Sequence, residues 1–249
     1  MYLIREGSEV TAPMQPGIDI MKFDGHWTGQ NSGYFRGSEA DIKVLYNDLI
    51  YYDLKAFSGA NIGDLTSFGI VNNNIAKTAF KDMTYDDKNE NVLFEFKIEN
   101  NLLNLKSNMY DYMCGMGVGF DSSFVKGKVD VVMPTALQVG IVDTKEQEAL
   151  FKKIVGDRFS DFINYTSYVD YSEVSLDGKK VKAGNSLLRG LGGFCSYIIS
   201  SEYIYAAIVG DDSIDYFTND EKYSKKMPKP IADWATNKEG LKINYNYKE

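Results

Sequence analysis

The chain has 249 residues, of which 44% are hydrophobic and 25% are charged, a composition that is typical of a folded globular protein and not of a disordered one. Its formal net charge of −8 argues against nucleic acid and anionic membranes as partners, and a basic protein fits that charge better. No apolar run reaches about 18 residues, so the sequence predicts no membrane-spanning helix. Tyr and Phe number 18 and 14, and both residue types favour strands.

The first 22 residues are predicted to form a tether. They contain Pro13, Pro16 and Gly17, which interrupt regular structure, and they leave room for one short strand at Tyr2–Ile4. The opening six residues are too few, and too soon charged, to be a signal peptide. We therefore expect either a cytosolic protein that starts at Met1 or a chain that follows a removed signal or anchor.

Residues 23–127 carry the pattern of a small β-barrel or sandwich. Gly25-His26-Trp27 matches the Gly-x-Trp that lipocalins and similar small barrels show at their first strand, where the Trp closes the barrel floor. Short alternating segments follow, and the turn-rich segment 58–64 is expected to separate two of them. Frequent turns and the lack of a helical pattern favour a barrel or sandwich. The predicted strands lie at 41–45, 49–57, 69–71 and 76–80.

The clearest hairpin of the chain comes next. Phe94, Phe96 and Ile98 alternate with charged residues, which is the two-residue period of a strand with one buried face. Asn100-Asn101 can take the positive φ angles of a tight turn, and apolar residues alternate again after it. A further short apolar run at Val118–Phe120 ends this half of the chain.

The second half of the chain, residues 128–249, has the pattern of an α+β domain with an antiparallel sheet. Thr144 and Gln147 have the spacing of a capping box, and Gly156 is placed to end the helix that they begin. A second short helix is predicted at 157–163. The chain as a whole is thus predicted to be β-rich and to have two domains.

A hairpin and a three-stranded meander are predicted to follow. Asp177-Gly178 is a favourable hairpin turn, and the glycines of 190–193 form a loop before the meander. Pro228 and Pro230 start a short helix that carries Trp234. The predicted strands are 169–174, 179–183, 195–199, 203–209, 213–217 and 241–247.

Few residues of the chain offer chemistry. Cys114 and Cys195 are too far apart for a zinc or iron–sulfur motif, and they can form one disulfide in an oxidising compartment or remain two buried thiols. The single histidine, His26, could act as an acid or base at a barrel mouth, although a histidine at a strand end is more often structural. We treat both cysteines, Trp27 and Trp234 as structural candidates, and predict no catalytic, metal-binding or cofactor-binding residue.

Three pairs of neighbouring carboxylates, Asp86-Asp87, Asp211-Asp212 and Asp220-Glu221, are interpreted as exposed turns. A glycosidase needs two carboxylates at a defined separation in space, which a sequence does not provide. Gly190–Gly193 lacks the Lys and the Ser or Thr of a phosphate-binding loop and is interpreted as a loop or bulge. These patterns favour a protein that binds over one that catalyses.

Several short motifs resemble those of bacterial envelope proteins of the LprI-type lysozyme-inhibitor family. Cys114-Gly115 followed by Val118–Asp121 is similar to the CG…V.FDG.Y segment of that family, and Ser122–Phe124 stands where Gly-x-Tyr would be. Phe23–Trp27 matches the FDG.W opening of the family's β-rich unit. Further likenesses lie at 150–156, 189–191, 204–207, 216–219 and 228–234.

The chain also departs from that family. The cysteine-rich segment is missing, because Cys195 is the only cysteine after Cys114. The Cys-Lys-Pro-His-Asp-Cys loop of inhibitors of vertebrate lysozyme is missing as well, so no inhibitory residue is carried over to this chain. The resemblance implies an extracytoplasmic bacterial protein, in the periplasm or at the cell envelope.

Three functions follow as hypotheses. The first is a non-enzymatic, lysozyme-inhibitor-like or immunity-like protein that occludes a basic wall hydrolase, whose approach an acidic surface would speed. The second is carriage of a small hydrophobic ligand inside the N-terminal barrel. The third is a hydrolase. A closed, ligand-sized cavity in the barrel would favour carriage, whereas a filled core with a protruding acidic loop would favour the inhibitor.

Overall fold

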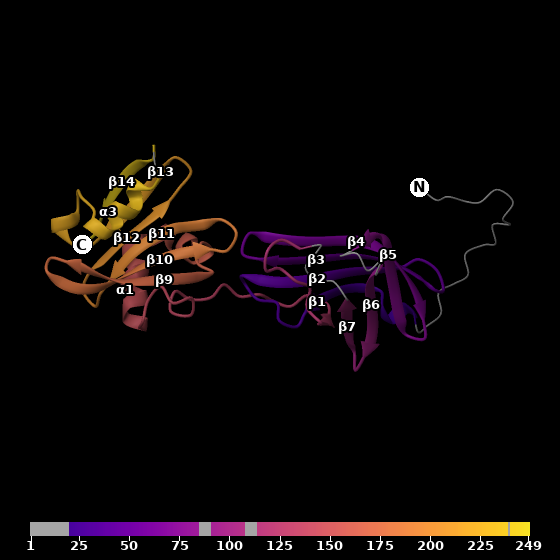
Figure 1. Cartoon of the computed structure of the whole chain (residues 1–249). Coiled ribbons are helices and arrows are strands. Elements are labelled where there is room, and N and C mark those ends of the chain that lie inside the picture. Colours follow the sequence, from indigo (N-terminus) through magenta and orange to yellow (C-terminus); the bar gives the residue numbers. More distant parts are fainter. Residues whose placement is uncertain (1–19, 85–90, 108–113, 239) are drawn as a thin grey trace. The chain divides into compact units, whose positions relative to one another are not determined.

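The structure is a computed structural model that describes residues 20–84, 91–107, 114–238 and 240–249. The chain forms two compact units, residues 1–131 and 132–249 (Figure 1). The sequence placed the boundary between its two domains at residue 127. The end of the predicted tether forms a short 3₁₀ helix, η1 (Ile20–Lys22), and the strand expected at 2–4 lies outside the described residues.

The first unit is a closed barrel of eight antiparallel strands, which confirms the predicted small barrel and decides against a sandwich. The strands follow one another around the barrel in chain order, and the first pairs with the eighth to close it. They are β1 (Gly25–Gly29), β2 (Arg36–Val44), β3 (Leu49–Ser58), β4 (Asn61–Asn72), β5 (Ile75–Thr84), β6 (Asn91–Glu99), β7 (Leu102–Ser107) and β8 (Ser123–Lys126).

Large side chains fill the described interior of the barrel. Trp27 is 2% exposed, and its indole Nε1 donates a hydrogen bond of 2.8 Å to the carbonyl of Phe23, so the one polar atom of the side chain is satisfied. The rings of Tyr52 and Phe96 lie 4.7 Å apart, and the side chain of Phe94 is fully buried beside them in the same core cluster. The barrel core therefore combines large aromatic side chains with aliphatic ones, such as Ile50 and Leu54.

Two turns of the barrel can be compared with the prediction from the sequence. The hairpin between β6 and β7 turns at Asn100-Asn101, with φ angles of 52° and 63°, as the sequence predicted. The prediction of a turn-rich segment over 58–64 is wrong, because β4 runs without a break from residue 61. The turn is confined to Gly59, with φ of 61°, and Ala60, and Gly63 already pairs with Ala56 of β3. Strand β3 provides pairing partners along the length of β4, and the turn propensity of residues 58–64 does not reveal this long-range pairing.

The second unit is a six-stranded sheet with helices on both faces, which confirms the α+β class. The predicted antiparallel sheet is wrong at one edge, where the last strand runs parallel to its neighbour. The chain crosses between these two strands through helix α3 (Lys229–Thr236), and such a crossover returns the chain in the same direction. In sheet order the strands are β14 (Lys242–Tyr247), β13 (Ser213–Thr218), β12 (Ile204–Val209), β11 (Gly192–Ile199), β10 (Lys179–Leu188) and β9 (Tyr168–Leu176).

Helix α1 (Lys145–Val155) begins as the sequence predicted. The side chain of Thr144 accepts a hydrogen bond from the backbone N–H of Gln147, and the side chain of Gln147 accepts one from the backbone of Thr144, which completes the capping box. The helix expected at 157–163 divides into a 3₁₀ turn, η3 (Gly156–Arg158), and helix α2 (Phe159–Asn164). A last 3₁₀ turn, η4 (Glu221–Tyr223), precedes α3.

Helices α2 and α3 lie on opposite faces of the sheet. The rings of Phe162 in α2 and Phe217 in β13 are 6.4 Å apart, whereas Ile231 of α3 packs in one core cluster with Tyr216. Tyr216 and Phe217 are neighbours on one strand, so their side chains point to opposite sides. Within the described residues, no helix combines the length and the apolar character that crossing a membrane requires.

Candidate functional site

Four carboxylates point outward from neighbouring strands of the barrel. Their neighbours along the strands, such as Ala40 and Leu54, are fully buried in the core, and successive side chains of a strand point to opposite sides. The four residues come from β2, β3 and β4, so no contiguous sequence motif marks them. We call this surface the acidic face, and it consists of Glu39, Asp41, Asp53 and Asp64.

The strand register places like charges beside each other on the acidic face. Asp41 of β2 lies directly opposite Asp53 of β3. The next row differs, because Lys55 lies between Glu39 and Asp64 and opposes each of them with an unlike charge. Like charges directly opposite each other destabilise a sheet. The opposition of Asp41 and Asp53 is thus a local conflict in the barrel, and such conflicts occur mainly at functional sites.

Three side chains of the barrel already interact with the acidic face, and one of them is Thr66, whose hydroxyl donates a hydrogen bond of 3.2 Å to Asp53 Oδ1. Lys55 Nζ lies 3.0 Å from Asp53 Oδ2, and this hydrogen bond, together with the charges of Asp53, Asp41 and Glu39, raises the pKa of Lys55. His26 Nδ1 lies 2.8 Å from Asp41 Oδ1. The acidic face therefore stabilises positive charge at its surface, as a binding site for a basic group must do.

His26, the acid–base candidate of the sequence, lies beside a hydroxyl that a substrate cannot reach. Its Nε2 is 3.5 Å from Thr28 Oγ1, so Thr28, His26 and Asp41 follow one another like a nucleophile, a base and a carboxylate. The Thr28 hydroxyl donates a hydrogen bond of 2.8 Å to the carbonyl of Gly127, and Thr28 is only 4% exposed. Thr28 therefore ties β1 to the chain at residue 127, whereas the contact between His26 and Asp41 joins β1 to β2.

Exposed apolar side chains border the acidic face at both ends of β3 and β4. Phe57 and Ile62 are paired at one end and are 38% and 70% exposed. At the other end, Tyr51 and Phe68 are paired with their rings 5.6 Å apart, and Ile70 is 56% exposed. Apolar side chains that gather on a surface are a mark of protein interaction sites.

The segment that carries the family likeness has a structural role in the barrel. Val118 and Phe120 lie outside any strand but are buried in the barrel core. Asp121 is also buried: its backbone N–H donates to Ser38 Oγ at 3.0 Å, and its Oδ2 accepts from the backbone N–H of Asn31 at 3.3 Å. Residues 118–121 are therefore packed into the barrel and do not form an exposed binding loop.

Both cysteines are thiols in the structure, and they belong to different units; Cys195 is buried, whereas Cys114 is only partly buried. Cys114 packs against Gly63 of β4, where any Cβ would overlap the Cys114 sulfur. Cys195 is fully buried in β11. The glycine at position 63 is thus required by packing rather than by a turn.

Burial raises the pKa of the Cys195 thiol well above its ordinary value. Because the thiolate is the reactive form, we expect an alkylating reagent at neutral pH to modify Cys114 in the folded protein and to leave Cys195 unmodified until the second unit unfolds. Mass spectrometry after labelling in native and in denaturing buffer checks this. Equal labelling of Cys195 in both buffers would contradict its buried position.

A pocket of about 420 Å³ lies in the second unit, between the sheet and helix α3. The Oδ1 atom of Asn185 is buried, and no described residue donates a hydrogen bond to it. Lys229 and Asp233 pair with each other at 2.7 and 2.9 Å. The volume of the pocket suits a small molecule. Its lining residues come from β9, β10, β11 and α3, so the sequence alone could not show that they lie together. The lining residues are Ser172, Val174, Ser175, Ala183, Asn185, Ser196, Lys229, Pro230 and Asp233.

The remaining sequence candidates have structural positions. Asp211-Asp212 is an exposed turn between β12 and β13, and Asp220 caps η4 while its Oδ2 accepts a hydrogen bond of 2.7 Å from Tyr205. Gly192 and Gly193 open β11, and Trp234 packs partly buried against the core of the second unit. The pair Asp86-Asp87 lies outside the described residues.

Comparisons with known proteins leave the family open. No family model matches this chain, and no curated protein or solved structure matches it. The resemblance to LprI-type lysozyme inhibitors therefore stays a prediction that rests on the motifs quoted above.

Proposed function

We propose that the protein is a non-enzymatic binding protein whose acidic face docks a basic protein, with a lysozyme-like wall hydrolase at the bacterial envelope as the leading candidate. The observation that carries this proposal is the opposition of Asp41 and Asp53 across neighbouring strands. A cationic side chain of the partner placed between the two carboxylates would remove their mutual repulsion. Binding would thus gain both the new attraction and the relief of a strain already present in the barrel.

The net charge supports the barrel as the docking unit. Residues 1–131 contain 18 Asp and Glu against 12 Lys and Arg, whereas residues 132–249 contain 17 against 15. A basic partner would therefore be drawn to the first unit over distances of about one Debye length, roughly 8 Å at physiological ionic strength.

Lys55 indicates what kind of group the partner would supply. Its ammonium contacts Asp53 Oδ2, and His26 already contacts Asp41 Oδ1. We therefore assign Asp41 Oδ2 and the carboxylate of Asp64 as the acceptors for the partner. An arginine of the partner could contact a carboxylate with two parallel hydrogen bonds, which a lysine cannot do. With apolar side chains at both borders, the acidic face suits a basic patch that is flanked by apolar residues.

Carriage of a hydrophobic ligand inside the barrel has less support. Tyr52, Phe94, Phe96 and Phe124 are all 0% exposed, and they occupy the described interior. Protein cores of this kind are packed as densely as organic crystals. The filled interior supports binding on the outer surface of the barrel over binding within it.

Replacing Asp41 and Asp53 by asparagine tests the proposal, because asparagine keeps the shape of the side chain and removes its charge. We expect Asp41→Asn/Asp53→Asn to bind a basic wall hydrolase at least about tenfold more weakly. The free energy of unfolding should change by less than about 1 kcal/mol, since exposed ion pairs contribute little. Calorimetric titration against a panel of basic lysozymes measures the affinity, and urea denaturation measures the stability.

The matched control is Asp211→Asn/Asp212→Asn, which removes the same two charges from an exposed turn of the second unit. We expect this control to bind like the unmodified protein. Equal weakening in both variants would show that net charge, and not the acidic face, governs binding. If the unmodified protein bound none of the basic hydrolases, the proposal would be wrong.

A further inference from the structure

Strand β14 forms an open edge of the sheet in the second unit. Among the described strands it pairs with β13 alone. The backbone N–H of Lys242 donates a hydrogen bond of 3.4 Å to the carbonyl of Asp212, and the backbone N–H of Lys248 donates one of 3.0 Å to the carbonyl of Thr218. In a parallel ladder the N–H and C=O groups of successive residues point to alternate sides of the strand, so the backbone groups of the even-numbered residues face β13. The odd-numbered residues of β14 therefore direct their N–H and C=O groups to the open edge.

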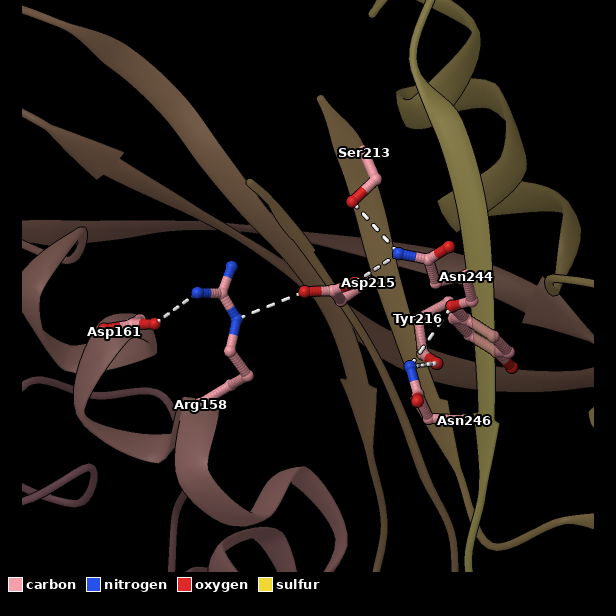
Figure 2. Close-up of polar contacts among 7 residues, drawn as sticks. All are labelled: Arg158, Asp161, Ser213, Asp215, Tyr216, Asn244 and Asn246. Atoms are coloured by element: carbon pink, nitrogen blue, oxygen red, sulfur yellow. Dashed lines mark hydrogen bonds and ion pairs between the residues drawn. The ribbon is translucent and has the colours of Figure 1, made fainter. Parts of the chain in front are cut away.

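The asparagine side chains of β14 fix this strand on its neighbour. Asn244 Nδ2 donates to Ser213 Oγ at 3.0 Å and to Asp215 Oδ1 at 2.9 Å, as Figure 2 shows. Asn246 Nδ2 donates to the carbonyl of Tyr216 at 3.2 Å. Asp215 is itself held by Arg158, whose Nε lies 3.3 Å from its Oδ2 (Figure 2). The edge is therefore ordered before any partner arrives, which lowers the entropy cost of pairing.

The open edge also carries apolar side chains. Ile243, Tyr245 and Tyr247 are 39%, 42% and 39% exposed. Natural proteins protect edge strands with prolines, bulges or inward-pointing charges, and residues 243–247 contain neither proline nor a charged residue. Lysines stand only at the two ends of the strand, at 242 and 248. An unprotected edge of this kind is suited to pairing with another strand.

The sequence of β14 is nearly palindromic. Read outward from Tyr245, the residues on the two sides are Asn and Asn, then Ile and Tyr, then Lys and Lys. We propose that two copies of this chain pair through β14, antiparallel, about a two-fold axis that passes through Tyr245. This proposal is independent of the function proposed for the barrel.

The position of the two-fold axis determines which residues of the two copies would exchange backbone hydrogen bonds. With the axis at Tyr245, Tyr245 lies opposite Tyr245 of the second copy, and Ile243 lies opposite Tyr247. These are the residues whose N–H and C=O groups face the open edge, so each opposed pair can exchange both of its hydrogen bonds. A register shifted by one residue would place inward-facing backbone groups at the contact and lose these bonds.

Side chains complement each other in the same register. On the face that carries Tyr216, the opposed pairs are tyrosine with tyrosine and isoleucine with tyrosine, which are favourable cross-strand pairs. On the other face, Asn244 lies opposite Asn246. The contact involves one short strand, so it is smaller than a permanent interface, and we expect a reversible dimer whose population rises with concentration.

Sedimentation velocity over a range of concentrations tests the proposal with the full chain. We expect the unmodified protein to shift from monomer towards dimer as its concentration rises to about 1 mM, a range that detects weak association. Tyr245→Lys places two like charges on the axis and should keep the protein monomeric. The matched control, Tyr168→Lys, makes the same change at a 56% exposed position of the opposite edge strand, β9, and should dimerise like the unmodified protein.

Disulfide cross-linking tests the register of the proposed strand pair and does not depend on the folding of Tyr245→Lys. Opposed residues of a hydrogen-bonded pair have Cα atoms about 5.5 Å apart, which suits a disulfide. In a Cys114→Ser background, which removes the accessible thiol of the barrel, we expect Tyr245→Cys to form a covalent dimer under mild oxidation, and Tyr168→Cys and the background protein to form none. A monomer at all concentrations, a dimer that Tyr245→Lys leaves intact, or equal cross-linking at position 168 would overturn the proposal.

Discussion

Trp27→Ala is expected to lower the free energy of unfolding of the first unit by about 3–5 kcal/mol. The side chain is 2% exposed, so the substitution removes a large apolar group from the barrel core and leaves a cavity. It also leaves the carbonyl of Phe23 without the hydrogen bond from the indole. Urea denaturation followed by tyrosine fluorescence and circular dichroism measures the change.

The other tryptophan provides the control for this prediction. Trp234 is only partly buried on α3, so Trp234→Ala should cost clearly less than Trp27→Ala. A loss below about 1 kcal/mol for Trp27→Ala would place the indole at the surface and contradict its position in the barrel core.

Gly29→Ala is expected to destabilise the barrel by about 2–4 kcal/mol, because overpacking and the loss of a buried hydrogen bond act together. A Cβ at position 29 would overlap both the carboxylate of Asp121 and the hydroxyl of Ser38. The Ser38 hydroxyl accepts a hydrogen bond from the backbone N–H of Asp121, and the Asp121 carboxylate accepts one from the backbone N–H of Asn31, so neither group can move freely. The midpoint of urea denaturation, compared with that of the unmodified protein, gives the effect.

Gly33→Ala is the matched control for this substitution. No atom of the described residues lies within 4 Å of a Cβ built at position 33, and the backbone of Gly33 does not need a positive φ. The control should therefore leave the stability nearly unchanged or raise it slightly. Similar midpoints for the two variants would mean that Asp121 does not pack against β1 as described.

Local patterns predicted the parts of the fold that local physics determines. The alternation of Phe94, Phe96 and Ile98 predicted β6, the asparagine pair at 100–101 predicted its turn, and the spacing of Thr144 and Gln147 predicted the start of α1. Each of these features depends on residues within a few positions of one another. They could therefore be found without knowing which strands are neighbours.

Features that depend on distant neighbours could not be predicted. The unbroken course of β4 follows from its pairing with β3, and the parallel direction of β14 follows from the crossover through α3. The acidic face was missed for the same reason. Asp41 and Asp53 become opposite only through the strand register, and in the sequence each is an ordinary charged residue of an alternating strand.

The central claim, that the acidic face docks a basic protein, is tested most directly by the salt dependence of the association rate. Between about 0.01 M and 1 M salt the Debye length falls from about 30 Å to about 3 Å. We expect the rate constant for association with a basic wall hydrolase to fall steeply over this range, and to fall much less for Asp41→Asn/Asp53→Asn. Stopped-flow or surface-capture kinetics measures both. Association that does not respond to salt, or that responds equally in the unmodified protein and the variant, would contradict the account.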